Sequence, residues 1–565
     1  MRWLTLLPRS RHAAGTGAAL MACTLVVSSA YATRPASASS LPEMVLQDDA
    51  ALLHRPADQV ARTLDRLVGL GVDRVRLTAN WSTLTRDADS RVAPAGFDAA
   101  DPAAYEPARW ITLDRAATLA SARGLRVLID VGFWAPVWAT NDARGPRARS
   151  NIDPRHYADF AVAVARRYDG TFVPPVQGDA AAPAPDDAVL AGVFGPLPGA
   201  GAGRPTVLPV DRPPALPVVD EMALWNEPNH PALLLPQWRS ATSAPTSPAV
   251  YRRMVLAAYP AVKRLRPVLR VLIGNTSSTG GVPGTGTGPV PPLRFLRQLA
   301  CVDRRLRPIT SGGCVGFTML PGDGWAHHPY TAGQSPIHRS APDRPDDVRI
   351  AELGRLSTLL DTLAERGRIA PANRRIHLTE FGYETHDIGK RQGLSQRAQA
   401  HWLTWAEYRA TRLAQVVSVA QFLLGDQLPA PTRVSDSIAR PFGQFYSGLL
   451  DGQGRDKLAV RSFTTGLFAQ RRRDGREMLW VRLRGGDGRR TIRIQRRAPD
   501  GSWGIVETAG VPGGMTRDTF GLRADAAGSR YSRPIAPGGT YRVIVTGGAR
   551  TQTGLPTTEE PADSG

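Results

Sequence analysis

Two glutamates in the sequence have the residue type and the placement that acid–base chemistry requires. Glu227 follows the apolar run 218–224, and Glu380 ends a second apolar segment, 374–380. A pair of carboxylates can cleave a glycosidic bond, because one with a raised pKa protonates the departing oxygen while the other attacks the anomeric carbon or activates water. Either glutamate alone is weak support for this chemistry, so the prediction depends on a fold that brings the two together.

Short apolar runs rich in Val, Ile and Leu alternate with amphipathic stretches over most of the chain, which predicts βα units and a parallel sheet. The predicted strands are 43–47, 73–78, 125–131, 219–225, 269–274, 315–326, 374–380 and 416–423. The predicted helices are 56–69, 109–123, 154–168, 247–266, 291–300, 346–366 and 394–412. Eight strands with insertions are typical of a (β/α)8 barrel, in which the carboxyl ends of all strands meet on one rim. The two glutamates, 153 residues apart, are therefore expected to converge.

The alternative to a barrel is a doubly wound open sheet. No Gly-x-Gly-x-x-Gly motif follows the first predicted strand, which counts against a dinucleotide-binding fold. We therefore predict an α/β fold with a TIM barrel over 41–459. From residue 460 short strands separated by turn signals predict a small antiparallel β-sandwich over 460–547. The polar, proline-containing segment 548–565 is typical of a disordered tail.

The motifs around the two glutamates resemble those of glycoside hydrolase clan A, the retaining (β/α)8 enzymes that include families 5 and 39. The resemblance covers about residues 43–460. In that clan an Asn-Glu-Pro at the end of strand four carries the acid/base, which maps to Glu227, and its Asn, here Asn226, binds the sugar 2-hydroxyl. A Glu that ends strand seven, often followed by Phe or Tyr and Gly, is the nucleophile, which maps to Glu380.

Three more residues fit the resemblance. Arg76 is similar to the clan's strand-two arginine, which holds the nucleophile ionised by charge pairing; an ion pair at the rim of the core is the alternative. The clan's His-x-Tyr pattern is found as His328 and Tyr330, which implies a tyrosine that orients the nucleophile and a histidine near the scissile bond. The neighbouring His327 is interpreted as a buried hydrogen-bonding residue. Adjacent strand side chains point to opposite faces, so we expect no metal site there.

Several aromatic residues are candidates for contact with sugar rings. Trp134 and Trp138 follow the third predicted strand and either stack on sugars or pack within their loop. The clan often has a sugar-binding Trp at the end of strand eight, where this chain has Phe422 as a weaker substitute. The β-sandwich has few aromatics beyond Trp480 and Trp503, so we expect a structural brace more than a polysaccharide-binding module. Asp130 lies inside a predicted strand and begins no recognisable motif, so no role is predicted for it.

The N-terminus has the three parts of a secretory signal peptide. A basic segment at 2–11 precedes an apolar run at 17–27 and an Ala-x-Ala cleavage site at 30–32. The apolar run is too short to cross a bilayer. We therefore predict a signal peptide at 1–32 and a secreted protein without a membrane span, with an uncleaved anchor as the alternative.

Cysteine usage agrees with export. Cys23 lies in the predicted signal, which leaves Cys301 and Cys314, 13 residues apart. In an oxidising compartment these two can form one disulfide; two free buried thiols are the alternative. Two sulfurs without a histidine in ligand spacing do not make a zinc site.

The net charge of +20 does not predict nucleic-acid binding. Only three of the 70 basic residues are lysines, and the arginines are scattered without the patch and aromatic platforms of a nucleic-acid site. Weak attraction to anionic cell-wall polymers is a better fit. Neither Gly-x-Ser-x-Gly nor His-Glu-x-x-His occurs, which counts against other hydrolase classes.

Together these features predict a secreted retaining glycoside hydrolase that acts on a β-linked poly- or oligosaccharide by double displacement and needs no cofactor. The alternative is a non-catalytic carbohydrate-binding or cell-envelope protein that keeps the barrel. The sequence leaves the sugar, endo or exo action and the oligomeric state open.

Overall fold

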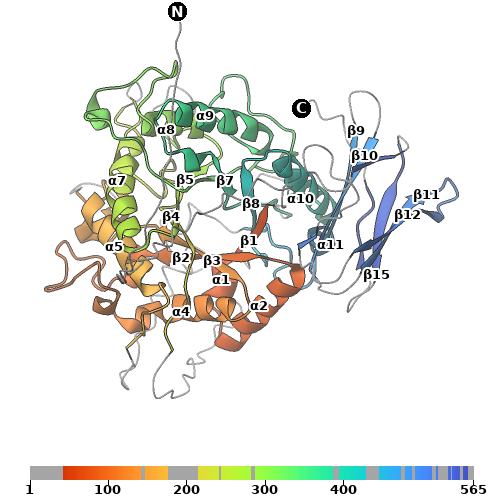
Figure 1. The fold of residues 1–565 in the computed structure, drawn as a ribbon, viewed down its shortest axis with the longest axis horizontal. Helices are drawn as coiled ribbons and strands as arrows, with labels where there is room; N and C mark the ends of the chain where they lie inside the picture. Colours follow the sequence, from red (N-terminus) through yellow and green to blue (C-terminus); the bar gives the residue numbers. More distant parts are fainter. Residues whose placement is uncertain are drawn as a thin grey trace, which may run out of the picture. The chain divides into compact units, whose positions relative to one another are not determined.

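A closed barrel of eight parallel strands forms the centre of the protein (Figure 1). The computed structural model describes residues 42–141, 147–175, 214–240, 244–281, 287–385, 393–427, 445–471, 477–485, 490–511, 517–518, 532–535, 538–546 and 552–557. The barrel strands are β1 (Glu43–Gln47), β2 (Arg74–Asn80), β3 (Arg126–Gly132), β4 (Glu221–Leu224), β5 (Arg270–Ser277), β6 (Gly324–His328), β7 (Ile376–Leu378) and β8 (Val416–Phe422). Each pairs with the next, and β8 pairs with β1, so the predicted barrel is confirmed and the open sheet is excluded.

Helices lie between the strands, as βα units require. They are α1 (Asp49–Leu52), α2 (Ala57–Leu70), α3 (Trp81–Leu84), α4 (Pro107–Ser121), α5 (Pro154–Arg167), α7 (Ser247–Leu265), α8 (Pro292–Leu299), α9 (Leu353–Glu365) and α10 (Gln396–Thr411). Helices α4, α5, α7 and α8 have proline in the first turn, where its missing N–H costs nothing. Helix α2 ends at Gly71, whose φ of 77° suits glycine. No helix in the described ranges is long and apolar enough to cross a membrane.

The barrel strands alternate between two environments. On β3, Ile129 and Val131 belong to the large apolar cluster that the helices cover. Leu128 belongs instead to a small separate cluster with residues of β4, β5 and β6, and Asp130 follows it in the same period of two. On β2, Val75 belongs to the large apolar cluster, and the next residue, the buried Arg76, points to the opposite side, toward the barrel interior. Charged side chains are therefore held inside the barrel, where only a partner of opposite charge makes their burial tolerable.

The sixth strand starts later than predicted. Residues 315–323 were expected to be strand, but β6 begins at Gly324. The preceding segment contains Gly316 at φ 62° and Gly322 at φ 154°, backbone conformations that interrupt a strand ladder.

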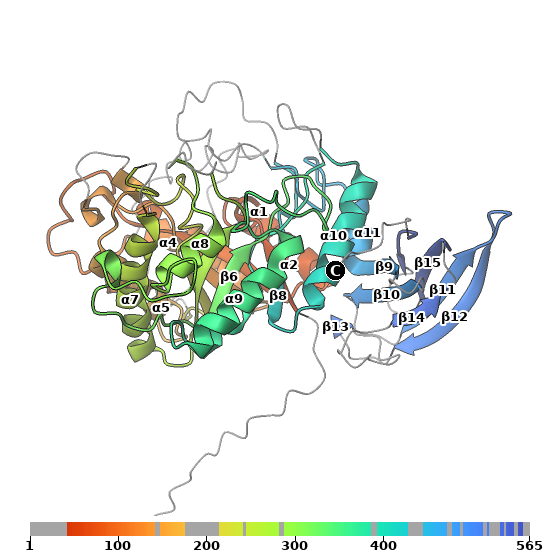
Figure 2. The same ribbon diagram turned by 90° about the horizontal axis from the view of Figure 1, so that it is seen from above.

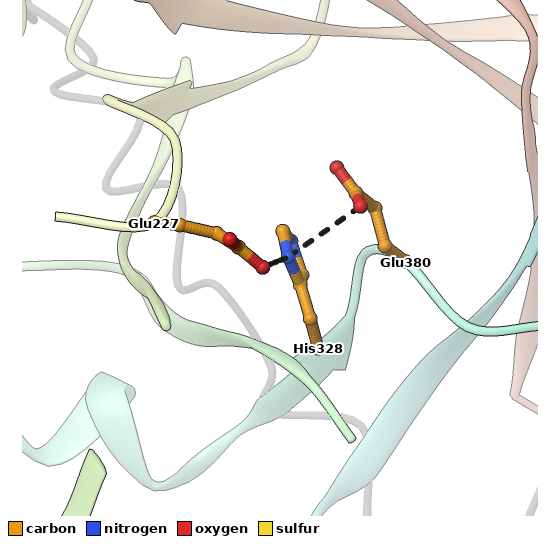
Figure 3. A group of neighbouring side chains, drawn as sticks. All are labelled: Glu227, His328 and Glu380. Carbon is orange, nitrogen blue, oxygen red and sulfur yellow. Dashed lines mark hydrogen bonds and ion pairs between the residues drawn. The ribbon is translucent and has the colours of Figure 1, made fainter. Parts of the chain in front are cut away.

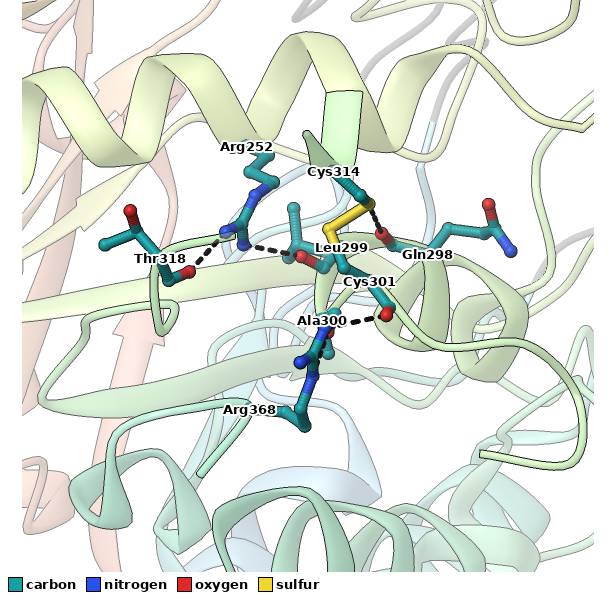
Figure 4. Close-up of a disulfide and its surroundings, with 8 residues drawn as sticks. All are labelled: Arg252, Gln298, Leu299, Ala300, Cys301, Cys314, Thr318 and Arg368. Atoms are coloured by element: carbon teal, nitrogen blue, oxygen red, sulfur yellow. Dashed lines mark hydrogen bonds between the residues drawn. A yellow bond between two sulfur atoms is a disulfide. The ribbon is translucent and has the colours of Figure 1, made fainter. Parts of the chain in front are cut away.

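This segment is instead held by a disulfide between Cys301 and Cys314, which confirms the predicted pairing (Figure 4). Arg368 donates to the carbonyl oxygens of Ala300 at 2.9 Å and Cys301 at 2.7 Å. Its guanidinium also lies 3.4 Å from the ring centroid of Phe317. The disulfide and these contacts fix the loop between α8 and β6.

The C-terminal part is the predicted antiparallel β-sandwich, preceded by α11 (Leu458–Thr464). Its strands are β9 (Thr465–Arg471), β10 (Glu477–Arg484), β11 (Arg490–Arg497), β12 (Trp503–Val511), β13 (Arg517–Asp518), β14 (Ser532–Ile535), β15 (Tyr541–Thr546) and β16 (Gln552–Thr553). One sheet contains β9, β10, β13 and β14, and the other has the order β12-β11-β15-β16. The core of the sandwich consists of Leu467, Leu479, Val481, Leu483, Ile492, Ile494, Tyr541, Val543 and Val545.

The disordered tail expected at 548–565 needs correction. Gln552–Thr553 pairs with β15, and the N–H of Thr557 donates to the carbonyl of Tyr541 at 2.9 Å. These contacts use backbone groups, so a polar composition did not reveal them. Residues 558–565 lie outside the described part of the chain, as does the signal peptide predicted at 1–32.

The sandwich contacts the barrel through α10 (Figure 2). Phe468 and Trp480 pack against Trp405 and Tyr408 of that helix. Beside them, Glu407 accepts hydrogen bonds from two arginines of β10. Burial raises the pKa of Glu407, but the two guanidinium groups outweigh burial and lower it. These contacts bury Trp480, and the role of the sandwich as a structural brace stays a prediction.

Removing the disulfide should weaken the fold without changing its architecture. We expect the double variant Cys301→Ala/Cys314→Ala to unfold at lower urea concentration, with a loss of about 3 kcal/mol, because a short closed loop no longer restricts the unfolded chain. Urea titration followed by tryptophan fluorescence measures this loss. Reductant should lower the wild-type midpoint toward that of the variant and leave the variant unchanged; equal midpoints without reductant would show that the crosslink contributes nothing.

Candidate active site

Glu227 and Glu380 meet at the carboxyl-end rim of the barrel, as the sequence predicted. Glu227 lies three residues beyond β4, and Glu380 lies two residues beyond β7. One oxygen of each carboxylate and one ring nitrogen of His328 all lie within 4.8 Å of one another (Figure 3). The side chain of Glu227 is 16% exposed and that of Glu380 is 10% exposed, so both are largely shielded from water.

The backbone around Glu227 adopts an uncommon conformation. Trp225 has φ 64° and Glu227 has φ 38°, values that non-glycine residues rarely adopt. The N–H of Trp225 donates to Val131 O at 3.0 Å, and the N–H of Glu227 donates to Asn275 O at 2.9 Å. These hydrogen bonds to β3 and β5 hold the turn in its uncommon conformation, and the turn directs the side chain of Glu227 toward His328.

Arg76 holds Glu380 from inside the barrel. Its Nη1 donates to Glu380 Oε1 at 2.5 Å, and its Nη2 donates to Asp130 Oδ2 and Asn226 Oδ1, both at 2.8 Å. Nη1 also donates to Gln47 on β1. Burial alone would lower the pKa of Arg76, but the two carboxylates raise it, so the guanidinium stays charged.

Asp130 is the residue that sequence reasoning missed. Burial raises the pKa of its carboxyl to about 6, although Arg76 acts in the opposite direction. Its other oxygen accepts from Asn275 Nδ2 at 3.1 Å. The one signal within its own strand is that Asp130 interrupts the apolar run of β3 at a position that the period of two places on the same face as Leu128.

Tyr330 holds the second oxygen of Glu380. Its hydroxyl donates to Oε2 at 3.1 Å, and burial raises the pKa of the phenol well above its usual value, so it remains a donor. The Tyr330 ring contacts Phe422 edge-on, with centroids 6.2 Å apart, and Phe381 at 6.3 Å. Phe422 therefore lies beside the ring of Tyr330, and its predicted contact with a sugar ring stays a prediction.

His328 contacts Glu227, and its predicted place near the scissile bond stays a prediction. Its Nδ1 lies 2.8 Å from Glu227 Oε1 and 3.6 Å from Glu380 Oε2. Burial acts to raise the pKa of Glu227. When His328 is charged, its hydrogen bond and charge, together with His230 and Arg76, lower that pKa below its usual value. His327 points to the opposite side, toward Thr276 and Val348 O, each at 2.9 Å. Burial lowers its pKa to about 4, so it is the neutral hydrogen-bonding residue that we expected.

The structure favours a packing role for the tryptophans of the third loop. Trp134 is 6% exposed, its Nε1 donates to Ala232 O at 3.2 Å, and its ring meets Phe133 edge-on. Trp138 is 8% exposed and packs edge-on against Trp81. Of the two interpretations that the sequence left open, loop packing fits both residues.

Asn275 reaches the site through a bulge in β5, between Ile273 and Thr276. It has φ 47° and follows Gly274 at φ 94°. A Cβ at Gly274 would lie 2.6 Å from the Trp325 ring, so only glycine fits there. The Gly-Asn pair at the end of a predicted strand was the sequence signal for this bulge.

The donor atoms of Glu227, His328 and Glu380 are close enough to share one cation. The oxygens of Glu380, however, already accept from Arg76 and Tyr330, and a cation there would lie beside a guanidinium charge. These contacts disfavour a cation at this position, and the expectation that the protein needs no metal stays a prediction.

Comparison with known proteins gives the chain no family. No protein-family model matches it, and no curated protein matches it. Solved structures similar to it include a glucosidase from Croceicoccus marinus, with 13% identity, a TM-score of 0.43, and coverage of 90% of this chain and 96% of that one. They also include GH5_18 from Streptomyces cattleya, with 16% identity, a TM-score of 0.40, and coverage of 76% and 79%. Likeness this low carries no conclusion about chemistry, so function is argued from the site.

Replacing Arg76 should cost stability in a pH-dependent way. In Arg76→Met the carboxylates of Asp130 and Glu380 lose their buried cation, which costs about 3–5 kcal/mol. Because Arg76 lowers the pKa of Asp130, its removal raises that pKa further. A folded-state pKa above the unfolded value means that stability is retained at low pH and lost as pH rises. The deficit should therefore be larger at pH 8 than at pH 5.

Urea unfolding of Arg76→Met and wild type at both pH values measures this deficit. Arg76→Lys is the matched control, because it keeps the charge while losing the forked hydrogen bonds. Its deficit should be smaller and nearly constant between pH 5 and pH 8. A pH-independent deficit in Arg76→Met would contradict the electrostatic account.

Proposed function

We propose that this protein is a retaining glycoside hydrolase, with Glu380 as nucleophile and Glu227 as acid/base. One observation supports this above the others: oxygens of the two carboxylates lie within 4.8 Å of each other on the rim of the barrel. Retaining glycosidases have carboxyl groups about 5–5.5 Å apart, whereas inverting enzymes leave about 6.5–9.5 Å for a water molecule.

The environments of the two glutamates suit different roles. Glu380 is held by a guanidinium on one oxygen and a phenol on the other, which favours a charged, oriented carboxylate. No arginine among the residues that the structure describes forms an ion pair with Glu227. Its carboxylate lies within hydrogen-bond distance of the imidazole of His328, a group able to exchange a proton with it. Two carboxylates with unlike surroundings are the arrangement that acid–nucleophile pairs use.

The reaction proceeds in two displacements. Glu380 attacks the anomeric carbon while the glycosidic C–O bond breaks and the departing oxygen takes the proton of Glu227. The product is a glycosyl ester of Glu380 and the released alcohol. Glu227, now a carboxylate, takes a proton from water, whose oxygen attacks the same carbon and frees Glu380. Esterification removes the charge of Glu380, which favours the ionised form of Glu227 for the second step.

Asn226 is suited to bind a sugar hydroxyl next to the reacting carbon. Its Oδ1 accepts from Arg76 and from Asn275 Nδ2, at 2.8 and 3.2 Å. The orientation of the amide is thereby fixed, and Nδ2 has no acceptor among the described residues. This supports the role that the resemblance implied for Asn226, donation to the 2-hydroxyl of a β-linked sugar.

We extend the proposal to secretion. The predicted signal peptide and the Cys301–Cys314 disulfide both suit an oxidising compartment. The substrate is then an extracellular poly- or oligosaccharide.

The first test is hydrolysis of a panel of aryl β-glycosides and plant or microbial polysaccharides. We expect wild-type activity on at least one substrate, and a loss of at least about 10³-fold in Glu380→Ala. Sodium azide should restore turnover in Glu380→Ala with a glycosyl azide of inverted configuration, because azide occupies the place of the missing carboxylate. In Glu227→Ala, azide should give a glycosyl azide of retained configuration.

Glu384→Ala is the matched control, since Glu384 lies on the same loop and accepts from Tyr446 N–H outside the proposed pair. It should keep activity. Full activity in Glu380→Ala would contradict the proposal, and binding of glycans without hydrolysis would favour a non-catalytic carbohydrate-binding protein.

Chelation gives a separate test of the reaction class. Dialysis against EDTA should leave activity unchanged, since the oxygens of Glu380 are already engaged by Arg76 and Tyr330. Loss of activity on chelation, with recovery on addition of a divalent cation, would identify Glu227, His328 and Glu380 as metal ligands instead.

A further inference from the structure

We infer that Asn275 and Thr379 are positioning residues that keep a proton on Nε2 of His328, so that a neutral His328 can only accept at Nδ1 and pairs with protonated Glu227. This inference rests on the proposed function for its catalytic meaning. The tautomer itself follows from hydrogen-bond geometry.

The orientation of the Asn275 amide is fixed by its surroundings. Three acceptors surround its Nδ2: Trp225 O at 2.9 Å, Asp130 Oδ1 at 3.1 Å and Asn226 Oδ1 at 3.2 Å. An amide oxygen in that place would face a carboxylate and a carbonyl with no proton between them. The other end of the Asn275 amide, which faces His328, is therefore the oxygen.

Both groups that face Nε2 of His328 must then accept a hydrogen bond. Asn275 Oδ1 lies 3.1 Å from Nε2, and an amide oxygen has no proton to give. Thr379 Oγ1 also lies 3.1 Å from Nε2, but its hydroxyl proton is donated to Asn275 Oδ1 at 2.7 Å. Nε2 therefore carries a proton whether the imidazole is neutral or charged.

The consequence falls on Glu227. With Nε2 protonated, a neutral imidazole has its lone pair on Nδ1, 2.8 Å from Glu227 Oε1. That contact is a hydrogen bond only if Glu227 supplies the proton, which is the form that a general acid needs. The other neutral tautomer would donate from Nδ1 and hold Glu227 as a carboxylate, unable to protonate a departing oxygen.

Charged groups from the other elements complete the surroundings of His328. Glu380 Oε2 lies 3.6 Å from Nδ1 of His328. Arg76 in turn forms ion pairs with both Glu380 and Asp130. His327, on the same strand, is neutral because burial lowers its pKa to about 4. Glu227 is the carboxylate nearest to Nδ1, so the proton on that line is shared chiefly between these two groups.

The tautomer is tested by ¹⁵N spectra of protein labelled at the histidine ring nitrogens, with His328 assigned from the spectrum of His328→Gln. Wild type should show a protonated Nε2 from pH 5 to pH 8. Asn275→Ala and Thr379→Val should each show mixed tautomers, because each loses one acceptor for the Nε2 proton. Thr379→Ser, which keeps the hydroxyl, should retain the wild-type spectrum.

Thr276→Val is the matched control, since Thr276 makes the equivalent contact to His327 and none to His328. It should shift only the His327 signals. An unprotonated Nε2 in wild type, or an unchanged tautomer in both Asn275→Ala and Thr379→Val, would overturn the inference. These spectra need no turnover, so they remain decisive even if no glycoside is hydrolysed.

Where activity is measurable, the pH profile gives the second readout. Loss of the fixed tautomer should move the alkaline limb of kcat/KM down by about one pH unit in Asn275→Ala, because Glu227 is then ionised more easily. KM should change little. A fall in kcat/KM by the same factor at every pH would indicate damage to the fold instead of a lost positioning role.

Discussion

The ion pairs of Arg76 inside the barrel are the constraint on which the rest of the site depends. A guanidinium in this interior is tolerable only with carboxylates around it, and Asp130 and Glu380 supply them. Arg76 donates to one oxygen of Glu380 and Tyr330 donates to the other, so β2, the segment after β6 and the end of β7 together set the position of this carboxylate. The alternation of side chains along the strands places Arg76 and Asp130 inside the barrel, and the need of Arg76 for negative partners fixes the carboxylate of Glu380.

The hydrogen-bond network around Arg76 also gives Glu227 and Glu380 different surroundings. Glu380 contacts a guanidinium, which is charged at every physiological pH, while Glu227 contacts the imidazole of His328. Asn275 links the two halves, since its amide nitrogen bonds Asp130 and its oxygen faces His328. The two glutamates therefore differ because their direct partners differ, and Asn275 contacts the hydrogen-bond networks of both partners.

Much of this arrangement could be predicted from the sequence, and the features that were not predicted depend on contacts that leave no local sequence pattern. Strand alternation and the two strand-end motifs were sufficient to predict the barrel, Glu227 and Glu380. Asp130 was passed over because its partner lies 54 positions away on another strand, and pairing across strands leaves no local pattern. Asn275 depends on a bulge, and the burial of Trp134 depends on tertiary packing. The late start of β6 and the short strand β16 were missed because glycine conformation and backbone pairing decided them.

Helix α10 belongs to the interiors of both the barrel and the C-terminal sandwich. One side of this helix packs against the barrel between β7 and β8, and the same helix presents Trp405, Glu407 and Tyr408 to the sandwich. A barrel separated from its sandwich would leave a carboxylate and two aromatic rings uncovered. The two parts therefore share one interior at α10, and the barrel surface formed by this helix is complete only with the sandwich in place.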